Sequence, residues 1–189
     1  HFAMRYPDAI NRLVICNVPH PAPFLKAMTK GFEQLFRSWY VLFFQLPWLP
    51  EMISRNISAG RLIRRGAAVR RNYPDEVVAL FDENASRPEN RTAMINYYRA
   101  LLRGGGLYRQ WKLGFPKIEV PTLMLWGEKD IALSMTSTLG TKDYVDNFTI
   151  RYFKGISHHV QQDTPDEVNA MLRAFLANET VPEYLDIQV

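Results

Sequence analysis

The chain has 189 residues, of which 47% are hydrophobic and 22% are charged, a composition that excludes intrinsic disorder. A single cysteine, Cys16, excludes a disulfide framework and any metal site built from several thiolates. No apolar stretch reaches the roughly 18 residues that span a membrane, because Glu51 and Arg55 close off the most apolar segment, residues 39–50. The length predicts one domain, with or without a lid.

The net charge of +4 is unevenly distributed along the chain. Residues 1–74 contain eleven basic and three acidic side chains, whereas residues 75–189 contain twelve basic and sixteen acidic ones. Much of the basic excess comes from six arginines: Arg55, Arg61, Arg64, Arg65, Arg70 and Arg71. Such a cluster could contact nucleic acid or anionic lipid, but no nucleic-acid-binding motif accompanies it. We interpret it as the solvated face of a surface helix and expect no nucleic-acid partner.

The first elements in chain order are a short helix and a buried strand. The chain begins at His1 without an initiator Met, and its first residues are typical of the last turns of a helix that Pro7 ends. Residues 13–18 form a nearly continuous apolar run bounded by Pro19, which predicts a parallel strand buried on both faces.

About a hundred residues with helical periodicity follow this strand. Pro74 opens one helix, with acidic residues in its first turn. Residues 94–102 place apolar side chains on one face and polar ones on the other, as an amphipathic helix does. The three glycines at 104–106 break the pattern, and we expect them to loosen the return to the sheet.

Two further strands and a helix complete the predicted order. Residues 120–126 form a second buried strand, whereas residues 148–152 alternate in polarity, which predicts an edge strand with one buried face. Residues 164–167 (Thr-Pro-Asp-Glu) are a capping box that starts a helix, and residues 178–189 have the composition of a tail. Strands alternating with helices predict an α/β fold with a parallel sheet. The long helical insertion follows the carboxyl end of the first strand, where it could act as a lid.

Two loops carry the best candidates for chemistry. Asp130 follows the second strand and His158 follows the third, so the carboxyl ends of adjacent parallel strands bring them to the same edge. A histidine near neutral pKa and an anion that orients it are the parts of a hydrolytic relay. Each residue alone is weak evidence, because a loop His or Asp is usually an ordinary surface residue. The pair at the ends of successive strands is a stronger signal.

The same loops resemble a known family. Trp126-Gly-Glu-Lys-Asp130 and residues 157–165 (Ser-His-His-Val-Gln-Gln-Asp-Thr-Pro) resemble the acid and histidine loops of α/β-hydrolases of the epoxide hydrolase branch. Residues 17–21 (Asn-Val-Pro-His-Pro) resemble the exit from that fold's sixth strand into its cap. Residues 38–40, 44–47 and 96–99 resemble the cap segments that supply two lid tyrosines. The resemblance extends from about residue 3 to residue 176.

This resemblance implies a role for each of four residues. His158 would activate water, and Asp130 would orient the His158 ring. Tyr40 and Tyr98 would hydrogen-bond the epoxide oxygen and protonate it as the ring opens. Phenols with an ordinary pKa of about 10 suit a developing alkoxide. Glu128 and His159 are the alternatives within the two loops, ranked lower on motif alignment alone. Without the resemblance, core packing would be the favoured explanation of the two tyrosines, because aromatic side chains on helix faces usually pack.

The sequence departs from the family in one important respect. The family's nucleophilic Asp sits at a sharp turn after the fifth strand, yet the 189 residues contain neither a Gly-x-Asp-x-Gly nor a Gly-x-Ser-x-Gly motif. Residues 1–7 match the helix that should follow that turn. The resemblance therefore implies a partial α/β-hydrolase fold that keeps the last three strands and an inserted all-helical cap. We expect a fragment without its nucleophile that does not hydrolyse epoxides alone.

The expected organisation is a core part at residues 1–21, a helical cap at residues 22–118 and a second core part at residues 119–189. The open alternatives are a haloacetate or haloalkane dehalogenase, for which Trp39 and Trp48 are candidate halide donors, a serine esterase of the same fold, and an incomplete remnant that acts as a binding module. We expect a small apolar substrate, an epoxide or a halide, and no cofactor or metal. The unpaired edge of the first strand predicts self-association. The lone cysteine favours the cytoplasm, although the compartment stays open.

Overall fold

The computed structural model describes residues 1–30 and 32–184. Its centre is a three-stranded parallel sheet in the order β1 (Leu13–Cys16), β2 (Thr122–Gly127) and β3 (Phe148–Phe153). Leu13 pairs with Thr122, which in turn pairs with Phe148, so the three strands start level and end at one edge. All six residues of β2 are buried, as expected for the apolar central strand of a parallel sheet. The sequence prediction of an α/β fold with a partial parallel sheet is therefore confirmed.

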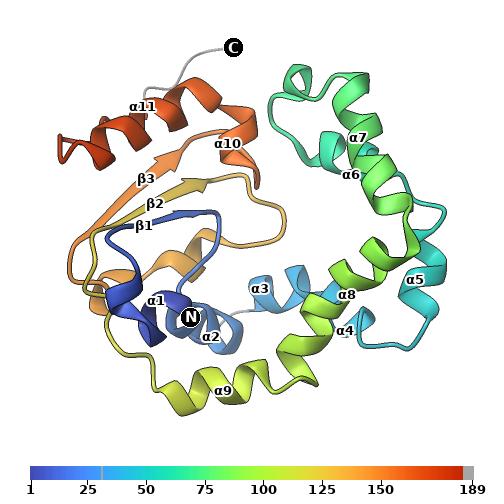
Figure 1. Cartoon of the computed structure of the whole chain (residues 1–189), viewed down its shortest axis with the longest axis horizontal. Coiled ribbons are helices and arrows are strands. Elements are labelled where there is room, and N and C mark those ends of the chain that lie inside the picture. The colour runs from blue at the N-terminus through green and yellow to red at the C-terminus, as the bar shows by residue number, and fades with distance from the viewer. Residues whose placement is uncertain (31, 185–189) are drawn as a thin grey trace.

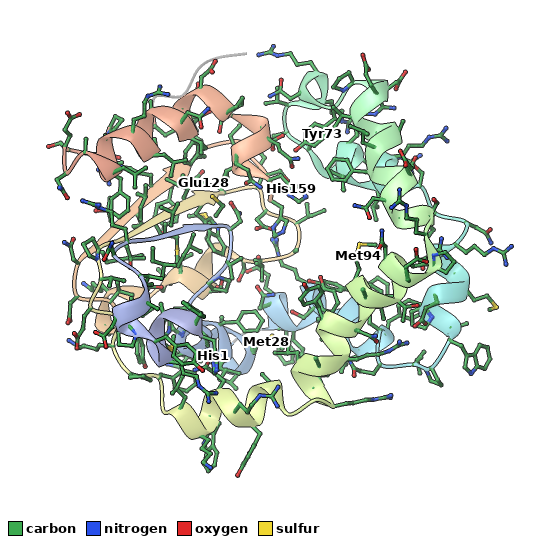
Figure 2. All side chains as sticks on the ribbon, in the orientation of Figure 1. His1, Met28, Tyr73, Met94, Glu128 and His159 are labelled. Atoms are coloured by element: carbon green, nitrogen blue, oxygen red, sulfur yellow. The ribbon has the colours of Figure 1, made fainter. Side chains whose placement is uncertain are left out.

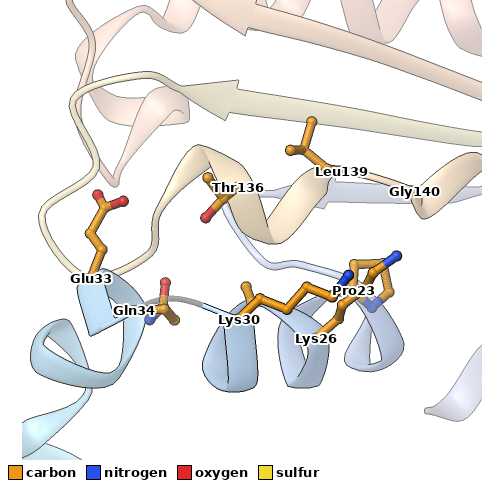
Figure 3. Close-up of a pocket in the computed structure, with 9 residues that line it drawn as sticks. Pro23, Lys26, Lys30, Glu33, Gln34, Thr136, Leu139 and Gly140 are labelled. Atoms are coloured by element: carbon orange, nitrogen blue, oxygen red, sulfur yellow. The ribbon is translucent and has the colours of Figure 1, made fainter.

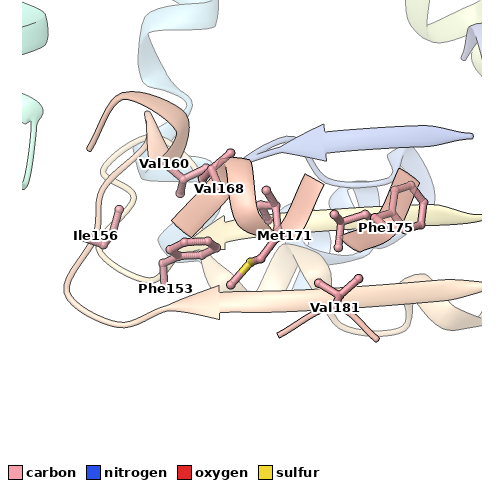
Figure 4. Close-up of a cluster of buried hydrophobic side chains, with 9 residues drawn as sticks. Phe153, Ile156, Val160, Val168, Met171, Phe175 and Val181 are labelled. Carbon is pink, nitrogen blue, oxygen red and sulfur yellow. The ribbon is translucent and has the colours of Figure 1, made fainter. Parts of the chain in front are cut away.

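Each face of the sheet carries its own apolar cluster. On one face, α10 (Val160–Asp163) and α11 (Pro165–Leu176) cover the side chains of Leu123, Leu125 and Phe153 (Figures 1 and 4). Helix α11 contributes Val168, Met171 and Phe175 to this cluster. On the opposite face, α1 (Phe2–Arg5) packs with Ile118 and Val145. The two clusters hold the strand ends, and hence the loops that follow them, in fixed positions.

The chain between β1 and β2 is a helical insertion, defined here as residues 21–113. Its α-helices are α2 (Pro21–Lys30), α3 (Phe32–Arg37), α4 (Trp39–Phe43), α5 (Leu49–Ser54), α6 (Ala59–Gly66), α7 (Asp75–Ser86), α8 (Pro88–Leu102) and α9 (Gly106–Leu113). Helices α3 to α8 form an arc that faces the carboxyl ends of the strands, and α9 leads back towards β2 (Figure 1). This arrangement places helix-borne side chains opposite the two loops that carry Asp130 and His158.

Short 3₁₀ helices occupy several connections. They are η1 (Pro7–Ala9), η2 (Arg70–Asn72), η3 (Met135–Thr138) and η4 (Thr141–Asp143). The first helix ends at Arg5, and Pro7 begins η1, as the proline predicts. None of the helices within residues 1–30 and 32–184 is both long and apolar enough to cross a membrane.

Two expectations about strand burial are wrong. Val14 in β1 is 37% exposed, and β1 is itself an outer strand of the described sheet. In β3, Thr149 and Arg151 are half-buried and not exposed. The chain after α11 explains this burial: the Arg151 guanidinium donates to the carbonyl oxygens of Val181 (2.7 Å) and Pro182 (2.9 Å). Strand β3 is nevertheless an edge of the described sheet, as predicted.

The predicted tail, residues 178–189, is also wrong in part. Val181 is buried in the cluster beneath α11, and the Tyr184 ring lies 4.6 Å from the ring of Phe153. Apolar side chains at these positions find a covered site beside β3, so the segment packs on the core instead of extending into solvent. The rest of the predicted tail, residues 185–189, lies outside the described residues.

Two local motifs act differently from their sequence patterns. Pro165 is the first residue of α11, as predicted, but Thr164 makes no side-chain capping bond. Its hydroxyl donates to the carbonyl oxygen of Val160 (2.9 Å) and thereby closes the preceding short helix, so the capping box is wrong. The glycines at 104–106 form a tight turn between α8 and α9. This turn requires glycine at position 104, because a Cβ there would lie 2.7 Å from the carbonyl oxygen of Ala100.

Candidate active site

The acid loop begins where β2 ends at Gly127. A Cβ on Gly127 would clash with the carbonyl oxygen of Ser157 and would lie 2.7 Å from that of Ile156, so only glycine allows the two loops to approach. The backbone N–H of Lys129 donates to the carbonyl oxygen of Ile156 (2.8 Å). The acid loop and the histidine loop are therefore joined through their backbones before any side chain is considered.

Asp130 is buried and fully hydrogen-bonded at the end of this loop. Its Oδ1 accepts from the backbone N–H groups of Ala132 (2.8 Å) and Leu133 (3.0 Å), and its Oδ2 accepts from the Asn17 amide (2.7 Å). Burial alone would raise the pKa of this carboxyl, but its bonds to His158, Leu133 and Asn17 outweigh burial and hold the pKa below its usual value. The carboxylate is therefore kept ionised.

His158 meets this carboxylate as the sequence predicts. Its Nδ1 lies 2.7 Å from Oδ2 of Asp130, and because an ionised carboxylate only accepts, Nδ1–H is the donor. This bond fixes the tautomer in which Nε2 carries the free lone pair. The His158 side chain is 34% exposed, and Nε2 has no hydrogen-bond partner among the described residues. Nε2 can therefore accept a proton from a small molecule beside it.

The two alternative residues in these loops are placed differently. Glu128 is exposed, in contrast to the buried Asp130. The His159 ring lies 4.9 Å from that of His158, and burial together with the neighbouring imidazole lowers the pKa of His159. His159 forms no bond to Asp130 and lies beside α10, across from Tyr73 of the helical insertion (Figure 2). The geometry favours Asp130 and His158, as the motif alignment does.

Asn17 is a site residue that the sequence analysis did not single out. Its side chain is fully buried, its Oδ1 accepts from the backbone N–H of Gly127 (3.0 Å) and its Nδ2 donates to Asp130. Its φ of 48° lies in the left-handed region, which asparagine tolerates better than most residues. Asn17 therefore ties the end of β1 to the acid loop. Its place directly after an apolar strand run was the available signal.

Tyr40 and Tyr98 meet on the helical side. Their rings pack edge to face with centroids 5.4 Å apart, and the Phe44 ring contacts both. Arg99 holds α8 against α4 and α5, because its guanidinium pairs with Glu51 and donates to the carbonyl oxygen of Phe44 (3.0 Å). Burial and the adjacent Tyr98 raise the pKa of Tyr40 to about 12, and the charge of Asp130 adds to the shift. Tyr40 therefore lies within the electrostatic reach of the acid loop.

A large apolar cavity opens beside these two rings. Its volume is about 710 Å³, and Tyr40, Tyr98 and Leu133 are among its lining residues. Leu133 also donates its N–H to Asp130, so the acid loop forms part of the cavity wall, although His158 itself does not line it. Trp39 and Trp48 are 64% and 70% exposed and do not line it. A mostly apolar cavity with a few polar groups is the usual form of a small-molecule site.

A second buried carboxylate, Asp163, connects the histidine loop to the helical insertion. It accepts from the backbone N–H groups of Ala68 (3.1 Å), Val69 (3.3 Å) and Ser157 (3.4 Å). The Asn72 amide donates in return to the carbonyl oxygen of Asp163 (2.9 Å). We call this set of bonds the Asp163 clamp. It fixes the residue next to His158 against the end of α6, and sequence analysis missed it because Asp163 lies next to the apparent capping box.

Other parts of the molecule offer less. A smaller cavity of about 360 Å³ lies between α2 and η3 (Figure 3), where Lys26, Lys30 and Glu33 meet Thr136 and Leu139. Within residues 1–30 and 32–184, no group of three or more His, Cys, Asp or Glu side chains could hold a metal ion.

Comparison with known proteins gives a consistent family. No family model matches the chain. Epoxide hydrolase 2 of Caenorhabditis elegans is 33% identical over 184 residues, which cover 94% of this chain and 51% of that protein. Human epoxide hydrolase 4 is 31% identical over 193 residues, covering 94% and 50%. This chain thus spans about half the length of the curated relatives that it matches.

The solved structures agree. The crystal structure of a Bacillus megaterium epoxide hydrolase in complex with an inhibitor superposes with a TM-score of 0.72 at 25% identity, over 93% of this chain and 64% of that one. A putative acyltransferase of Salmonella enterica, at 20% identity, shares the fold with a TM-score of 0.74. Together, the sequence matches and the shared fold support an epoxide hydrolase-like family of α/β-hydrolases for this chain.

Proposed function

We propose that this chain carries the base, the orienting acid and the oxygen-binding tyrosines of an epoxide hydrolase. His158 is the base, Asp130 orients it, and Tyr40 with Tyr98 receives the epoxide oxygen. The observation that supports this most strongly is the edge-to-face tyrosine pair on a cavity whose wall includes Leu133 of the acid loop. Relatives with the name epoxide hydrolase, matched over 94% of this chain, support the same assignment.

The proposed reaction has two steps. A carboxylate attacks an epoxide carbon, the carbon–oxygen bond breaks, and the departing oxygen takes a proton from a tyrosine to give a hydroxy ester. His158 then removes a proton from water, which attacks the ester carbonyl and releases the diol and the carboxylate. The imidazolium that forms on His158 is stabilised by the ionised Asp130 at 2.7 Å. The proton returns from the imidazolium to the tyrosinate through solvent.

The tyrosines suit the first step for an electrostatic reason. A pKa of about 12 keeps Tyr40 protonated at neutral pH, so that it always has a hydrogen to donate. An alkoxide is a stronger base than a phenolate, so proton transfer from Tyr40 to the opened ring remains favourable. Donors aimed at an oxygen that gains charge are among the strongest contributions to catalysis.

In our proposal, the carboxylate that attacks the epoxide comes from outside the 189 residues of this chain. The 189 residues contain no Gly-x-Asp-x-Gly motif, and β1 has a hydrogen-bonded neighbour on only one side within the described residues. A strand bearing the nucleophile next to β1 would bring it to the sheet edge that holds Asp130 and His158. On this proposal the purified chain binds epoxide-like molecules without converting them.

The dehalogenase alternative receives less support. A halide site needs donors such as the Trp39 and Trp48 indoles aimed into the cavity, yet both side chains are mostly exposed and outside it. The paired phenols instead suit an oxygen atom.

A binding measurement tests the proposal on the chain as it exists. A disubstituted urea presents a carbonyl oxygen in place of the epoxide oxygen, and isothermal titration calorimetry measures its affinity. Because each phenol contributes one neutral hydrogen bond, we expect Tyr40→Phe and Tyr98→Phe each to weaken binding by about fivefold. Tyr97→Phe is the matched control, since Tyr97 is adjacent to Tyr98 on α8 but 79% exposed. Equal affinities for all three variants and the unchanged chain would contradict the proposed oxygen site.

A further inference from the structure

Five arginines converge on one cavity at the end of α6. The cavity has a volume of about 470 Å³ and is lined by Arg61, Arg64, Arg65, Arg70 and Arg71. Arg61, Arg64 and Arg65 are spaced to share one side of α6, whereas η2 supplies the other two. This arginine cavity shares no lining residue with the apolar cavity that contains Tyr40 and Tyr98.

Acidic neighbours neutralise only part of this charge. Arg64 pairs with Asp75 (2.6 Å). Hydrogen bonds from the Ser58 hydroxyl and the Gly60 N–H lower the pKa of the Asp82 carboxyl, and the charge of Arg61 adds to this shift. The negative end of the α6 dipole favours the arginines of the last turn. The side chains of Arg65, Arg70 and Arg71 form no hydrogen bond or ion pair with any residue in the described part of the chain. Bringing like charges together in a concave site is unfavourable unless an anion joins them.

The backbone that carries two of these arginines is held in place. The Asp163 clamp binds the N–H groups of Ala68 and Val69 immediately before η2, and the amide of Asn72 at its end donates to the carbonyl oxygens of Gln162 and Asp163. Segment 68–72 is thus bonded at both ends to the histidine loop. Arg70 and Arg71 lie between these anchors, so their backbone is ordered before any ligand arrives.

We propose that the arginine cavity binds a compact, multiply charged phosphate group, such as a diphosphate. Guanidinium groups match the oxygens of phosphate with paired hydrogen bonds, and five of them around one concavity suit a ligand with several negative charges. A concave cluster also suits a compact group better than an extended polymer, which needs a long basic surface. The phosphate source is either a free molecule or the headgroup of a phosphoinositide. The site is separate from the proposed epoxide chemistry.

Calorimetric titration of the 189-residue chain with inorganic pyrophosphate tests this site. We expect one binding site per chain and a loss of affinity of at least tenfold in the Arg70→Gln/Arg71→Gln double variant. The matched control is Arg55→Gln/Arg103→Gln, which removes the same charge from two exposed arginines outside the cavity and should change affinity less than twofold. Circular dichroism melting verifies that both variants fold. Similar losses in both variants, or no binding by the unchanged chain, would overturn the proposal.

Two further arms identify the source of the phosphate. The first arm is co-sedimentation with phosphatidylcholine vesicles that contain phosphatidylinositol 4,5-bisphosphate. If the chain binds these vesicles, pyrophosphate releases it and Arg70→Gln/Arg71→Gln abolishes the binding, the site exists and its ligand is a lipid headgroup. Pyrophosphate binding without vesicle binding supports the site with a free phosphate as its ligand. Duplex DNA is the counter-test. If the chain binds duplex DNA, loses this binding in Arg70→Gln/Arg71→Gln and keeps it in the presence of pyrophosphate, the arginines form a nucleic-acid surface and the proposal is overturned.

Discussion

On the sheet side of the site, polar side chains are buried and paired, whereas on the helical side many apolar side chains remain exposed. Asn17 and Asp130 are almost completely buried, and every oxygen of the Asp130 carboxylate has a partner. On the helical side, Phe36 and Trp39 are 73% and 64% exposed. The sheet side therefore holds His158 in one position through Asp130, whereas the helical side leaves a broad apolar surface exposed.

The close approach of the two loops is the feature of the sheet side on which most depends. Gly127→Ala introduces a Cβ that clashes with the backbone of Ile156 and Ser157, which side-chain rotation cannot relieve. We expect the free energy of unfolding to fall by about 3 kcal/mol, measured by urea denaturation. Gly66→Ala in α6 is the control, since its Cβ meets only the side-chain tip of Ile131 at 3.3 Å. Equal effects of the two substitutions would break the contrast between a rigid sheet side and an adaptable helical side.

The Asp163 clamp is the expected point of contact between the two sides. Asp163→Leu leaves three backbone N–H groups without their acceptor, which should cost about 2–3 kcal/mol of unfolding free energy. Hydrogen exchange at Ala68 and Val69 should accelerate more than exchange within β2. Asp166→Leu, on the exposed first turn of α11, should cost less than about 1 kcal/mol. Unchanged exchange at Ala68 would show that the clamp does not join the two sides.

Acid should weaken the sheet side through Asp130. The folded protein holds the pKa of this carboxyl below its usual value, so it stabilises the fold at neutral pH. That stability should be present above the unfolded pKa of about 3.9 and be lost as the pH falls through the folded value. Urea midpoints measured from neutral to acidic pH should converge for the unchanged chain and Asp130→Asn, whereas Glu128→Gln should follow the unchanged chain throughout. A constant difference between the unchanged chain and Asp130→Asn would contradict this origin.

Alkali should have a smaller effect, on the helical side. Tyr40 has a pKa of about 12 against an ordinary value of about 10. A raised folded pKa means that the stabilising effect is complete below about pH 10 and is lost as the pH rises towards 12. Ultraviolet absorbance of tyrosinate should show a late titration step that loses the amplitude of one tyrosine in Tyr40→Phe and keeps its full amplitude in Tyr97→Phe. An identical late step in Tyr40→Phe would place the effect elsewhere, with Tyr73 as the next candidate because burial also raises its pKa.

The sequence correctly predicts the positions of side chains that directly follow the strands. Asp130 and His158 follow adjacent parallel strands, and topology alone brings them to one edge, where they form a 2.7 Å bond. The Asn17 and Asp163 contacts could not be predicted in this way. Asn17 needs a left-handed backbone and a partner 113 positions away, and Asp163 binds N–H groups more than 90 positions away. The Asp163 bonds depend on how the helical insertion docks on the sheet, whereas the Asn17 bonds depend on the backbone conformation where β1 ends.

Local patterns misled where tertiary contacts offered a better partner. Thr164 has the spacing of a capping residue but bonds the carbonyl oxygen of Val160, which a preceding short helix places within reach. Arg151 has the alternation of a solvent-facing strand residue, yet the returning chain at Val181 and Pro182 accepts its hydrogen bonds. In both cases the side chain satisfies a backbone carbonyl that the sequence pattern alone does not reveal.

Epoxide hydrolysis by a completed site tests the proposed division of labour most directly. The part of the Caenorhabditis elegans epoxide hydrolase 2 that this chain does not match can be joined to this chain, and diol formation from styrene oxide measured. We predict that a folded chimera forms diol, that His158→Gln accumulates the covalent ester without releasing diol, and that Tyr40→Phe slows ester formation. A folded chimera that releases diol equally well with His158→Gln would contradict the role proposed for this chain.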